Sequence, residues 1–135
     1  MSATEHLGGC LCGATRYRIA GTPTFAAYCH CQSCRRAGGA PYVAWATFPK
    51  TRFAFVGSPP ARYRSSAPVV RTFCATCGSP LTYEHSGRSE ELDVTLASFD
   101  EPGAVTPTCH IWVAAKLPWV VLADGLPQFP EWPGA

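Results

Sequence analysis

The sequence contains no apolar run of the roughly 18 residues that a membrane-spanning helix needs. Its longest apolar stretch, residues 110–124, is interrupted by Lys116 and Pro118. The opening residues MSATEHLGGC also lack the basic and apolar regions of a secretory signal. These absences argue against a membrane partner and against secretion, and we expect a cytoplasmic protein.

Charge is also scarce. Only 15% of the 135 residues are charged and the net charge is +2, whereas 47% are hydrophobic. This is too little charge for a disordered chain and too weak a basic balance for a dedicated nucleic-acid binder. No linker, internal repeat or low-complexity tract divides the sequence, so we expect one folded domain over residues 1–135.

Long amphipathic helical patterns are missing as well, while 13 prolines and 12 glycines indicate many turns. Period-two alternation of apolar and polar residues recurs instead, which is typical of strands. It is found in ATRYRIAG (14–21), PYVAWATF (41–48), RFAFVG (52–57), VVRTFC (69–74) and ELDVTLASF (91–99). The sequence therefore predicts a mainly β fold, with a turn at 89–91 leading into the last of these strands.

Cysteine, by contrast, is abundant. In a reducing compartment eight cysteines favour metal ligation or thiol chemistry over four disulfides. Seven of them form three groups, namely Cys10 and Cys12, then Cys29, Cys31 and Cys34, then Cys74 and Cys77. Cys109 stands alone.

Two of the groups together offer the four ligands of a structural zinc ion. A CxxC turn lets Cys74 and Cys77 converge on one ion, and Gly78 allows the backbone angles of such a turn. In an extended segment Cys10 and Cys12 would face the same side, so they could supply the other two sulfurs. We expect this zinc to join the two ends of the domain.

The remaining triad of Cys29, Cys31 and Cys34 lies on what reads as one short loop. Three protein ligands with an open position are typical of a reactive zinc, and a thiol is a suitable ligand for that position. We therefore interpret the triad as catalytic, on a second zinc ion.

Alternatives remain open at this point. The thiols could be free of metal and buried as small apolar groups. The triad could also be closed by Cys109 or His30, giving two structural zinc sites and no chemistry; an extended backbone would point His30 away from its neighbours' sulfurs. The aromatic side chains of Tyr42, Trp45 and Phe48, like those of Phe53 and Phe55, follow strand patterns and are expected in the core.

The sequence resembles the family of glutathione-dependent formaldehyde-activating enzymes, which is grouped with the centromere protein V-like domain. The resemblance is carried by GGCLCGATRY, CHCQSCRRAGGAP and FCATCGSPL in this order, with HIWVAAKLPW and DGLPQFP toward the carboxyl end. It spans nearly the whole chain. It implies an Mss4-like fold of coiled antiparallel β-sheets with zinc sites, and the same division of the cysteines between a structural and an active-site zinc.

The resemblance further implies a carbon–sulfur lyase type of enzyme, with a thiol and an aldehyde as partners. The implied reaction joins glutathione and formaldehyde to S-hydroxymethylglutathione. Arg35 and Arg36, beside the triad, and more weakly Lys116 are candidates to bind the carboxylates of glutathione. The alternative is a non-catalytic zinc module that binds a macromolecule, for which a converging stripe of arginines would be needed if the partner were nucleic acid.

Overall fold

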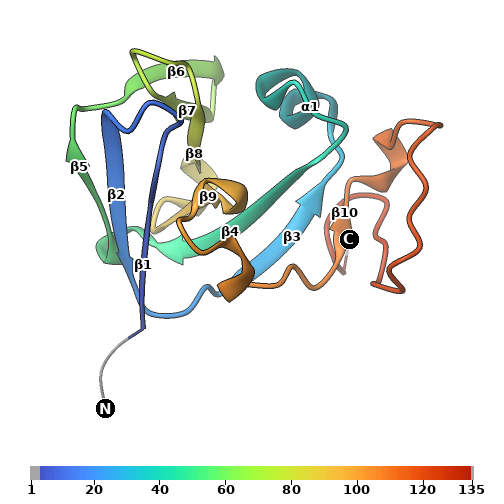
Figure 1. The fold of residues 1–135 in the computed structure, drawn as a ribbon. Coiled ribbons are helices and arrows are strands. Elements are labelled where there is room, and N and C mark those ends of the chain that lie inside the picture. Colours follow the sequence, from blue (N-terminus) through green and yellow to red (C-terminus); the bar gives the residue numbers. More distant parts are fainter. Residues whose placement is uncertain (1–3, 135) are drawn as a thin grey trace.

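The computed structural model describes residues 4–134 and contains two β-sheets packed against each other (Figure 1). The smaller sheet is antiparallel, in the order β1–β2–β5, with β1 (Glu5–Gly9), β2 (Thr15–Ala20) and β5 (Phe53–Gly57). The larger sheet has the order β10–β3–β4–β9–β8–β7–β6. Its strands are β3 (Phe25–Cys29), β4 (Val43–Pro49), β6 (Ala61–Ser66), β7 (Val69–Phe73), β8 (Pro80–His85), β9 (Glu91–Thr95) and β10 (His110–Ile111). Only β10 runs parallel to its neighbour, β3, so the predicted mainly β fold of antiparallel sheets is confirmed.

Helical structure is short throughout the described residues. The α-helix α1 covers Gln32–Gly38. The other helices are single 3₁₀ turns, namely η1 (Lys50–Arg52), η2 (Ser86–Arg88), η3 (Leu96–Ser98), η4 (Pro102–Ala104) and η5 (Val113–Ala115). Within residues 4–134, no helix is long and apolar enough to cross a bilayer.

The alternating segments of the sequence became strands, and β2 shows the alternation in burial most clearly. In β2 the side chains of Thr15, Tyr17 and Ile19 are buried, while those between them are half-buried or exposed. The segment expected as one strand over 91–99 ends earlier, since β9 stops at Thr95 and η3 follows.

The buried side chains form two clusters. The larger cluster lies between the two sheets and combines residues of β2, β4, β8 and β9; its largest fully buried side chains are Tyr17, Phe48, Ile19 and Leu81. The smaller cluster lies where β3 and β10 meet α1, and contains Ala27, Cys29, Cys34, Cys109 and Ile111. The larger cluster therefore includes one cysteine from each of the two pairs, Cys10 and Cys74, and the smaller cluster includes two of the triad.

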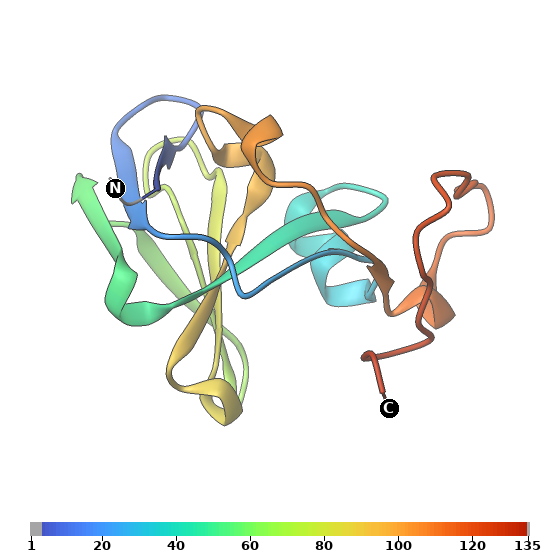
Figure 2. The same ribbon diagram turned by 90° about the horizontal axis from the view of Figure 1, so that it is seen from below.

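The chain beyond β10 folds back beside it. The backbone N–H of Phe129 donates to the carbonyl of His110 at 2.9 Å, and that of Trp112 donates to Glu131 at 3.1 Å. Figure 2 shows this carboxy-terminal segment on the α1 side of the molecule, away from the smaller sheet. It therefore forms part of the surroundings of α1.

The tight approach of β1 to the core gives a first prediction. A Cβ atom added at Gly8 would collide with the Tyr17 hydroxyl and the Ser98 carbonyl oxygen, whereas one added at Gly103 would meet nothing within 4 Å. We expect Gly8→Ala to lower the free energy of unfolding by about 2 kcal/mol, because the core cannot yield without displacing backbone. Gly103→Ala should stay within about 0.5 kcal/mol of the parent protein. Chemical denaturation of the zinc-loaded proteins measures both, and equal stabilities would contradict this packing.

Candidate functional site

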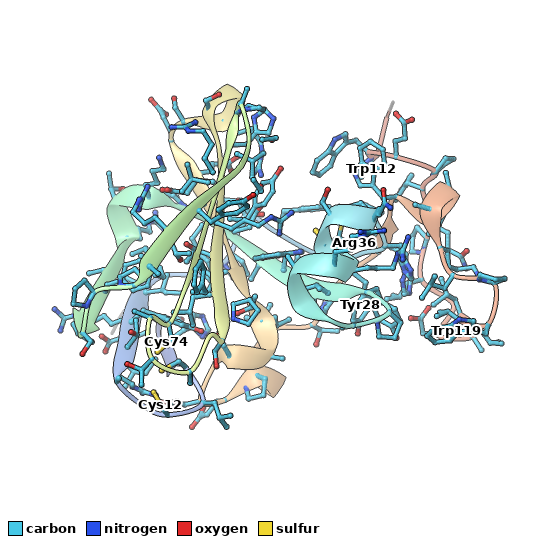
Figure 3. All side chains as sticks on the ribbon, turned by 90° about the horizontal axis from the view of Figure 1, so that it is seen from above. Cys12, Tyr28, Arg36, Cys74, Trp112 and Trp119 are labelled. Carbon is cyan, nitrogen blue, oxygen red and sulfur yellow. The ribbon has the colours of Figure 1, made fainter. Side chains whose placement is uncertain are left out.

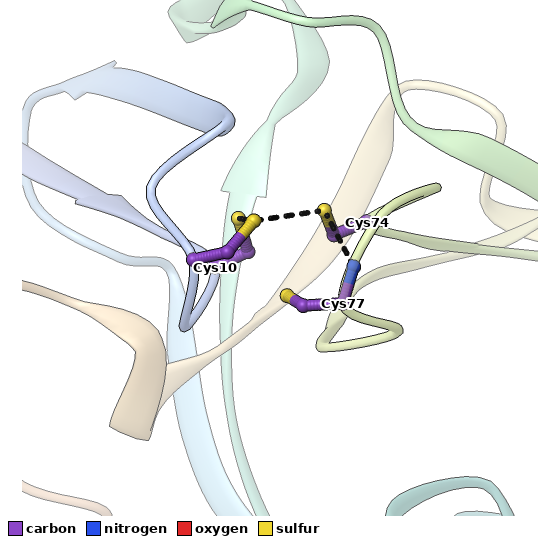
Figure 4. A group of neighbouring side chains, drawn as sticks. Cys10, Cys74 and Cys77 are labelled. Carbon is purple, nitrogen blue, oxygen red and sulfur yellow. Dashed lines mark hydrogen bonds between the residues drawn. The ribbon is translucent and has the colours of Figure 1, made fainter.

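The two cysteine pairs expected to share one metal lie together (Figure 4). The Sγ atoms of Cys10, Cys12, Cys74 and Cys77 all lie within 4.8 Å of one another. The Cys10–Cys12 and Cys12–Cys74 sulfur distances are 3.6 and 3.7 Å. Sulfur atoms arranged tetrahedrally at a Zn–S distance of about 2.3 Å would be about 3.8 Å apart, so this donor set fits zinc.

The backbone around the first pair corrects one expectation. Cys10 and Cys12 do not lie in an extended segment, because the chain turns after β1 and the N–H of Gly13 donates to the Cys10 carbonyl at 3.2 Å. The N–H of Thr15 donates to Cys10 Sγ at 3.3 Å. The turn brings the two sulfurs together more closely than alternation along a strand would.

The second pair lies on a similar turn. The N–H groups of Thr76 and Cys77 point at Cys74 Sγ, at 3.3 and 3.4 Å, and the N–H of Gly78 donates to the Cys74 carbonyl. Gly78 has a φ of 79°, the left-handed conformation that the sequence predicted. The hydrogen bond from the N–H of Cys77 has the largest effect among the contacts that lower the pKa of Cys74 to about 7. A lower pKa favours the thiolate that a metal needs.

Ser79 connects the two turns. Its Oγ accepts a hydrogen bond from the N–H of Leu11 at 3.0 Å and lies 3.2 Å from Cys77 Sγ. Its hydroxyl hydrogen is thus free to donate to Cys77, which lowers the pKa of that thiol to about 5. A serine between two ligand turns acts as an outer partner that orients a ligand.

The second group lies at the junction of β3 and α1, and its sulfur atoms are also within 4.8 Å of one another. Cys29 ends β3, Cys31 is the N-cap residue of α1, and Cys34 lies in the first turn of the helix. The expectation of one short loop was therefore wrong, because the thiol of Cys31 caps a helix: it accepts from the N–H of Cys34 at 3.3 Å. Gly39, with a φ of 59°, ends α1 in the left-handed conformation.

Contacts within the triad separate the acidities of its thiols. Hydrogen bonds from Cys29 and then Cys34 hold the pKa of Cys31 well below its usual range. Hydrogen bonds with Cys31 and then Cys34, followed by burial, raise the pKa of Cys29. Cys31, which is half-buried, is therefore the thiol of this group that ionises most readily.

A fourth ligand from His, Cys, Asp or Glu does not join the triad within residues 4–134. Cys109 is buried in the smaller core cluster and lies outside the metal-ligand group. His30 is fully buried, and its Nε2 lies 2.9 Å from His110 Nδ1. Neither of the two residues considered as a closing ligand is thus part of the group.

The contact of His30 extends into a chain of hydrogen bonds that the sequence did not indicate. His110 Nε2 lies 2.7 Å from a carboxylate oxygen of Asp124. A carboxylate only accepts, so His110 donates through Nε2, and a neutral His110 then accepts from His30 through Nδ1. Burial, the largest cause, lowers the pKa of His30 to about 4, and its Nδ1 has no partner among the described residues.

This chain of three side chains gives a second prediction. His110→Ala would leave His30 Nε2 buried and unpaired, and we expect it to lower the free energy of unfolding by about 3 kcal/mol. The hydrogen bond from His110 also lowers the pKa of Asp124. A depressed carboxyl pKa stabilises the fold above the unfolded value of 3.8 and loses that contribution as the pH falls through the folded value.

Asp124→Asn is the matched control. Asp124 is 40% exposed, so this variant should lose much less stability at pH 7 than His110→Ala does. It should also lose less stability than the parent protein between pH 5 and pH 3. Thermal denaturation across this range measures both effects. A His110→Ala variant as stable as the parent would show that the hydrogen bonds joining His30, His110 and Asp124 do not stabilise the fold.

Two cavities meet at the triad. A cavity of about 320 Å³ is lined by all three of its cysteines, and a larger one of about 730 Å³ by Cys34 alone among them. Cys34, Trp45 and Arg71 line both cavities. Phe48 is buried in the larger core cluster, and Phe53 and Phe55 pack half-buried against it. Trp45 packs half-buried against the smaller cluster and also forms a wall of both cavities.

The basic residues proposed from the sequence line neither cavity. Arg36 is exposed on α1 (Figure 3), and the Nε of Arg35 is buried without a partner among residues 4–134. Lys116 Nζ donates to the carbonyls of Leu117 and Val120, at 3.1 and 2.6 Å. Figure 3 also shows that Cys12 and Cys74 lie well apart from α1, so the two cysteine groups are separate.

Two residues beside the triad were missed as site residues in the sequence. Arg71 Nη2 lies 3.9 Å from Cys34 Sγ. Trp112 lines the smaller cavity, packs edge-on against Trp132, and has a φ of 58°. A tryptophan in the left-handed region is strained, and such strain concentrates at functional sites; no sequence pattern marks either residue.

Comparison with known proteins agrees with this geometry. The family model described as glutathione-dependent formaldehyde-activating enzyme (GFA) matches residues 5–115. The chain belongs to the GFA family. A crystal structure of a Rhodobacter sphaeroides protein resembles this GFA-family chain with a TM-score of 0.59 at 22% identity, covering 91% of this chain and 98% of that chain. At this identity the likeness shows the shared fold, and no curated protein sequence gives a significant match.

Proposed function

We propose that this GFA-family protein catalyses the reversible addition of a thiol to an aldehyde, with glutathione and formaldehyde as the substrates. The family description supplies the pair of substrates. The reverse direction, cleavage of S-hydroxymethylglutathione, is a carbon–sulfur lyase reaction. Cys29, Cys31 and Cys34 are proposed as the catalytic metal ligands, and Cys10, Cys12, Cys74 and Cys77 as ligands of a structural zinc ion.

One observation carries the proposal. Three thiols converge on the wall of a cavity of about 320 Å³, and the described residues supply no fourth ligand to them. A zinc ion held by three protein ligands keeps a position for an exogenous group and stabilises a thiolate at neutral pH. The other cysteine group has four ligands, as a structural site should.

The proposed reaction needs little from the protein besides orientation. The thiolate sulfur attacks the carbonyl carbon, a carbon–sulfur bond forms, and the π electrons of the carbonyl move to oxygen. That oxygen takes up the proton released by the thiol, so that the thiol and the aldehyde give the hydroxymethyl thioether without any oxidant. Trp45, Ile111 and Trp112 line the smaller cavity and would exclude bulk water from the reacting atoms.

The same observation disfavours a non-catalytic zinc module, which would be expected to close both sites. The arginines that could bind nucleic acid come from five elements, namely β2, α1, η1, β6 and β7. Two of them are already paired with acidic residues, Arg16 of β2 with Asp100 and Arg62 of β6 with Glu84.

Exchange NMR on equilibrated glutathione and formaldehyde tests the proposal. The zinc-loaded protein should speed the interconversion of free and hydroxymethylated glutathione well above the rate in buffer. The Cys31→Ser variant should match buffer. A parent protein with a full complement of zinc that does not exceed the uncatalysed rate would refute the proposed function.

A further inference from the structure

Arg71 lies beside the triad, where its guanidinium packs against an aromatic ring. It lies on β7 directly opposite Tyr83 of β8, and its guanidinium carbon lies 4.9 Å from the centre of the Tyr83 ring. This cation–π contact between cross-strand neighbours fixes the side chain. Nη2 then lies 3.9 Å from Cys34 Sγ, so the guanidinium borders the triad.

The guanidinium of Arg71 has no carboxylate partner within residues 4–134. Arg88, which lines the same smaller cavity, is paired with Asp93 at 2.7 Å and with Glu91 at 3.5 Å. The carboxylate of Asp93 is occupied, since its other oxygen accepts from Thr47 at 2.6 Å. Arg71 is thus the arginine of this cavity that the described residues leave without an acid.

Most donors of Arg71 are available to a ligand. A guanidinium has five N–H groups in a planar fork. Among the described residues, the side-chain acceptor that contacts the Arg71 guanidinium is Cys34 Sγ. Its surroundings in the cavity walls are largely apolar, including Trp45, Val69 and Ile111. A half-buried cation in such surroundings gains more from an anionic partner than an exposed one does.

The position of Arg71 between the cavities suits a ligand that also reaches the triad. It lines both cavities, as does Cys34. The two volumes, about 320 and 730 Å³, fall in the range of small-molecule sites. None of Arg35, Arg36 and Lys116 lines either cavity.

Resting on the proposed function, we propose that Arg71 binds a carboxylate of the thiol substrate and so selects thiols that carry an acid group. The fork of the guanidinium accepts a carboxylate in two parallel hydrogen bonds, while the sulfur of the same molecule reaches the triad. Neutral thiols lack this second anchor.

Calorimetric titration of the zinc-loaded protein with 3-mercaptopropionate and with 2-mercaptoethanol tests the proposal. Arg71→Gln should weaken binding of the acid about tenfold or more, since hydrogen bonds to charged groups contribute about 1.5–3 kcal/mol. It should leave the neutral thiol unchanged, and Arg71→Lys should restore part of the affinity for the acid. Arg64→Gln removes the same charge from an exposed arginine of the neighbouring strand that lines neither cavity, and should change neither affinity.

Equal weakening of both thiols in Arg71→Gln would overturn the proposal, because Arg71 would then only balance the charge of the triad. A loss of kcat without a loss of acid binding would also overturn it. S-methylglutathione separates this inference from the proposed function, since it keeps both carboxylates but has no thiol. If the parent protein binds this probe through Arg71 but does not catalyse thiol addition, the inference is supported and the proposed function is not. If the parent protein catalyses the reaction but Arg71→Gln binds the acid as well as the parent does, the proposed function is supported and the inference is not.

Discussion

Cys74→Ala is expected to leave the protein unfolded at room temperature. Cys74 is 1% exposed and accepts two backbone N–H groups in addition to its place among four converging thiols. Binding of a structural zinc ion contributes about 10–16 kcal/mol to folding in small zinc domains. Because a domain is stable by only about 5–15 kcal/mol in total, loss of this site should remove most of that margin.

Cys109→Ala provides the matched control. Cys109 is 4% exposed, so the same atoms are removed from a similarly buried cysteine that belongs to neither group. This variant should lose only about 1 kcal/mol. Circular dichroism and zinc analysis compare the two proteins. A folded Cys74→Ala variant that is as stable as Cys109→Ala would show that the four-cysteine group does not hold the fold together.

Cys31→Ser is expected to abolish catalysis while leaving the fold intact. Serine is among the best N-cap residues, so its hydroxyl can take over the contact that Cys31 Sγ makes with the N–H of Cys34. The hydroxyl is a poor zinc ligand, and the triad should lose its metal. We expect zinc to fall from about two ions per chain to about one, activity to fall to background, and the melting temperature to change by only a few degrees.

The comparison of Cys31→Ser with Cys74→Ala tests the division between the two metal sites. Zinc analysis, exchange NMR and thermal melting of the same preparations supply the three readouts. Global unfolding of Cys31→Ser would contradict a catalytic role that is separate from folding, and so would a variant that keeps both metal ions and full activity.

The strands that the sequence revealed are those whose residues alternate between apolar and polar types. One face is buried in β2, whereas four consecutive residues are buried in β9. Alternation located β2, β4, β5, β7 and β9 within a few residues. It did not locate β3, whose sequence FAAYC has no alternating polar residues, or β6, whose residues are nearly all exposed. It also missed α1, because a helix of seven residues is too short to show a period of 3.6.

The cysteine groups could be read from spacing, since ligands at short intervals must lie close in space. The partnership of Cys10 and Cys12 with Cys74 and Cys77 was also predicted, although the local geometry proved to be a turn. The neighbours of the triad could not be predicted. Sheet register brings Arg71 beside the triad. The segment after β3's partner β10 brings Trp112 to the smaller cavity and Asp124 to His110. No local sequence pattern encodes these contacts.

The central claim is that the triad holds a metal whose open position accepts the glutathione thiolate. Cobalt-substituted protein titrated with glutathione tests it directly, because the absorption bands of cobalt report the number and type of its ligands. The parent protein should show a saturable rise in thiolate-to-cobalt absorption, and the Cys31→Ser variant, which keeps only the four-cysteine site, should show none. A parent spectrum that stays unchanged at millimolar glutathione would contradict the account.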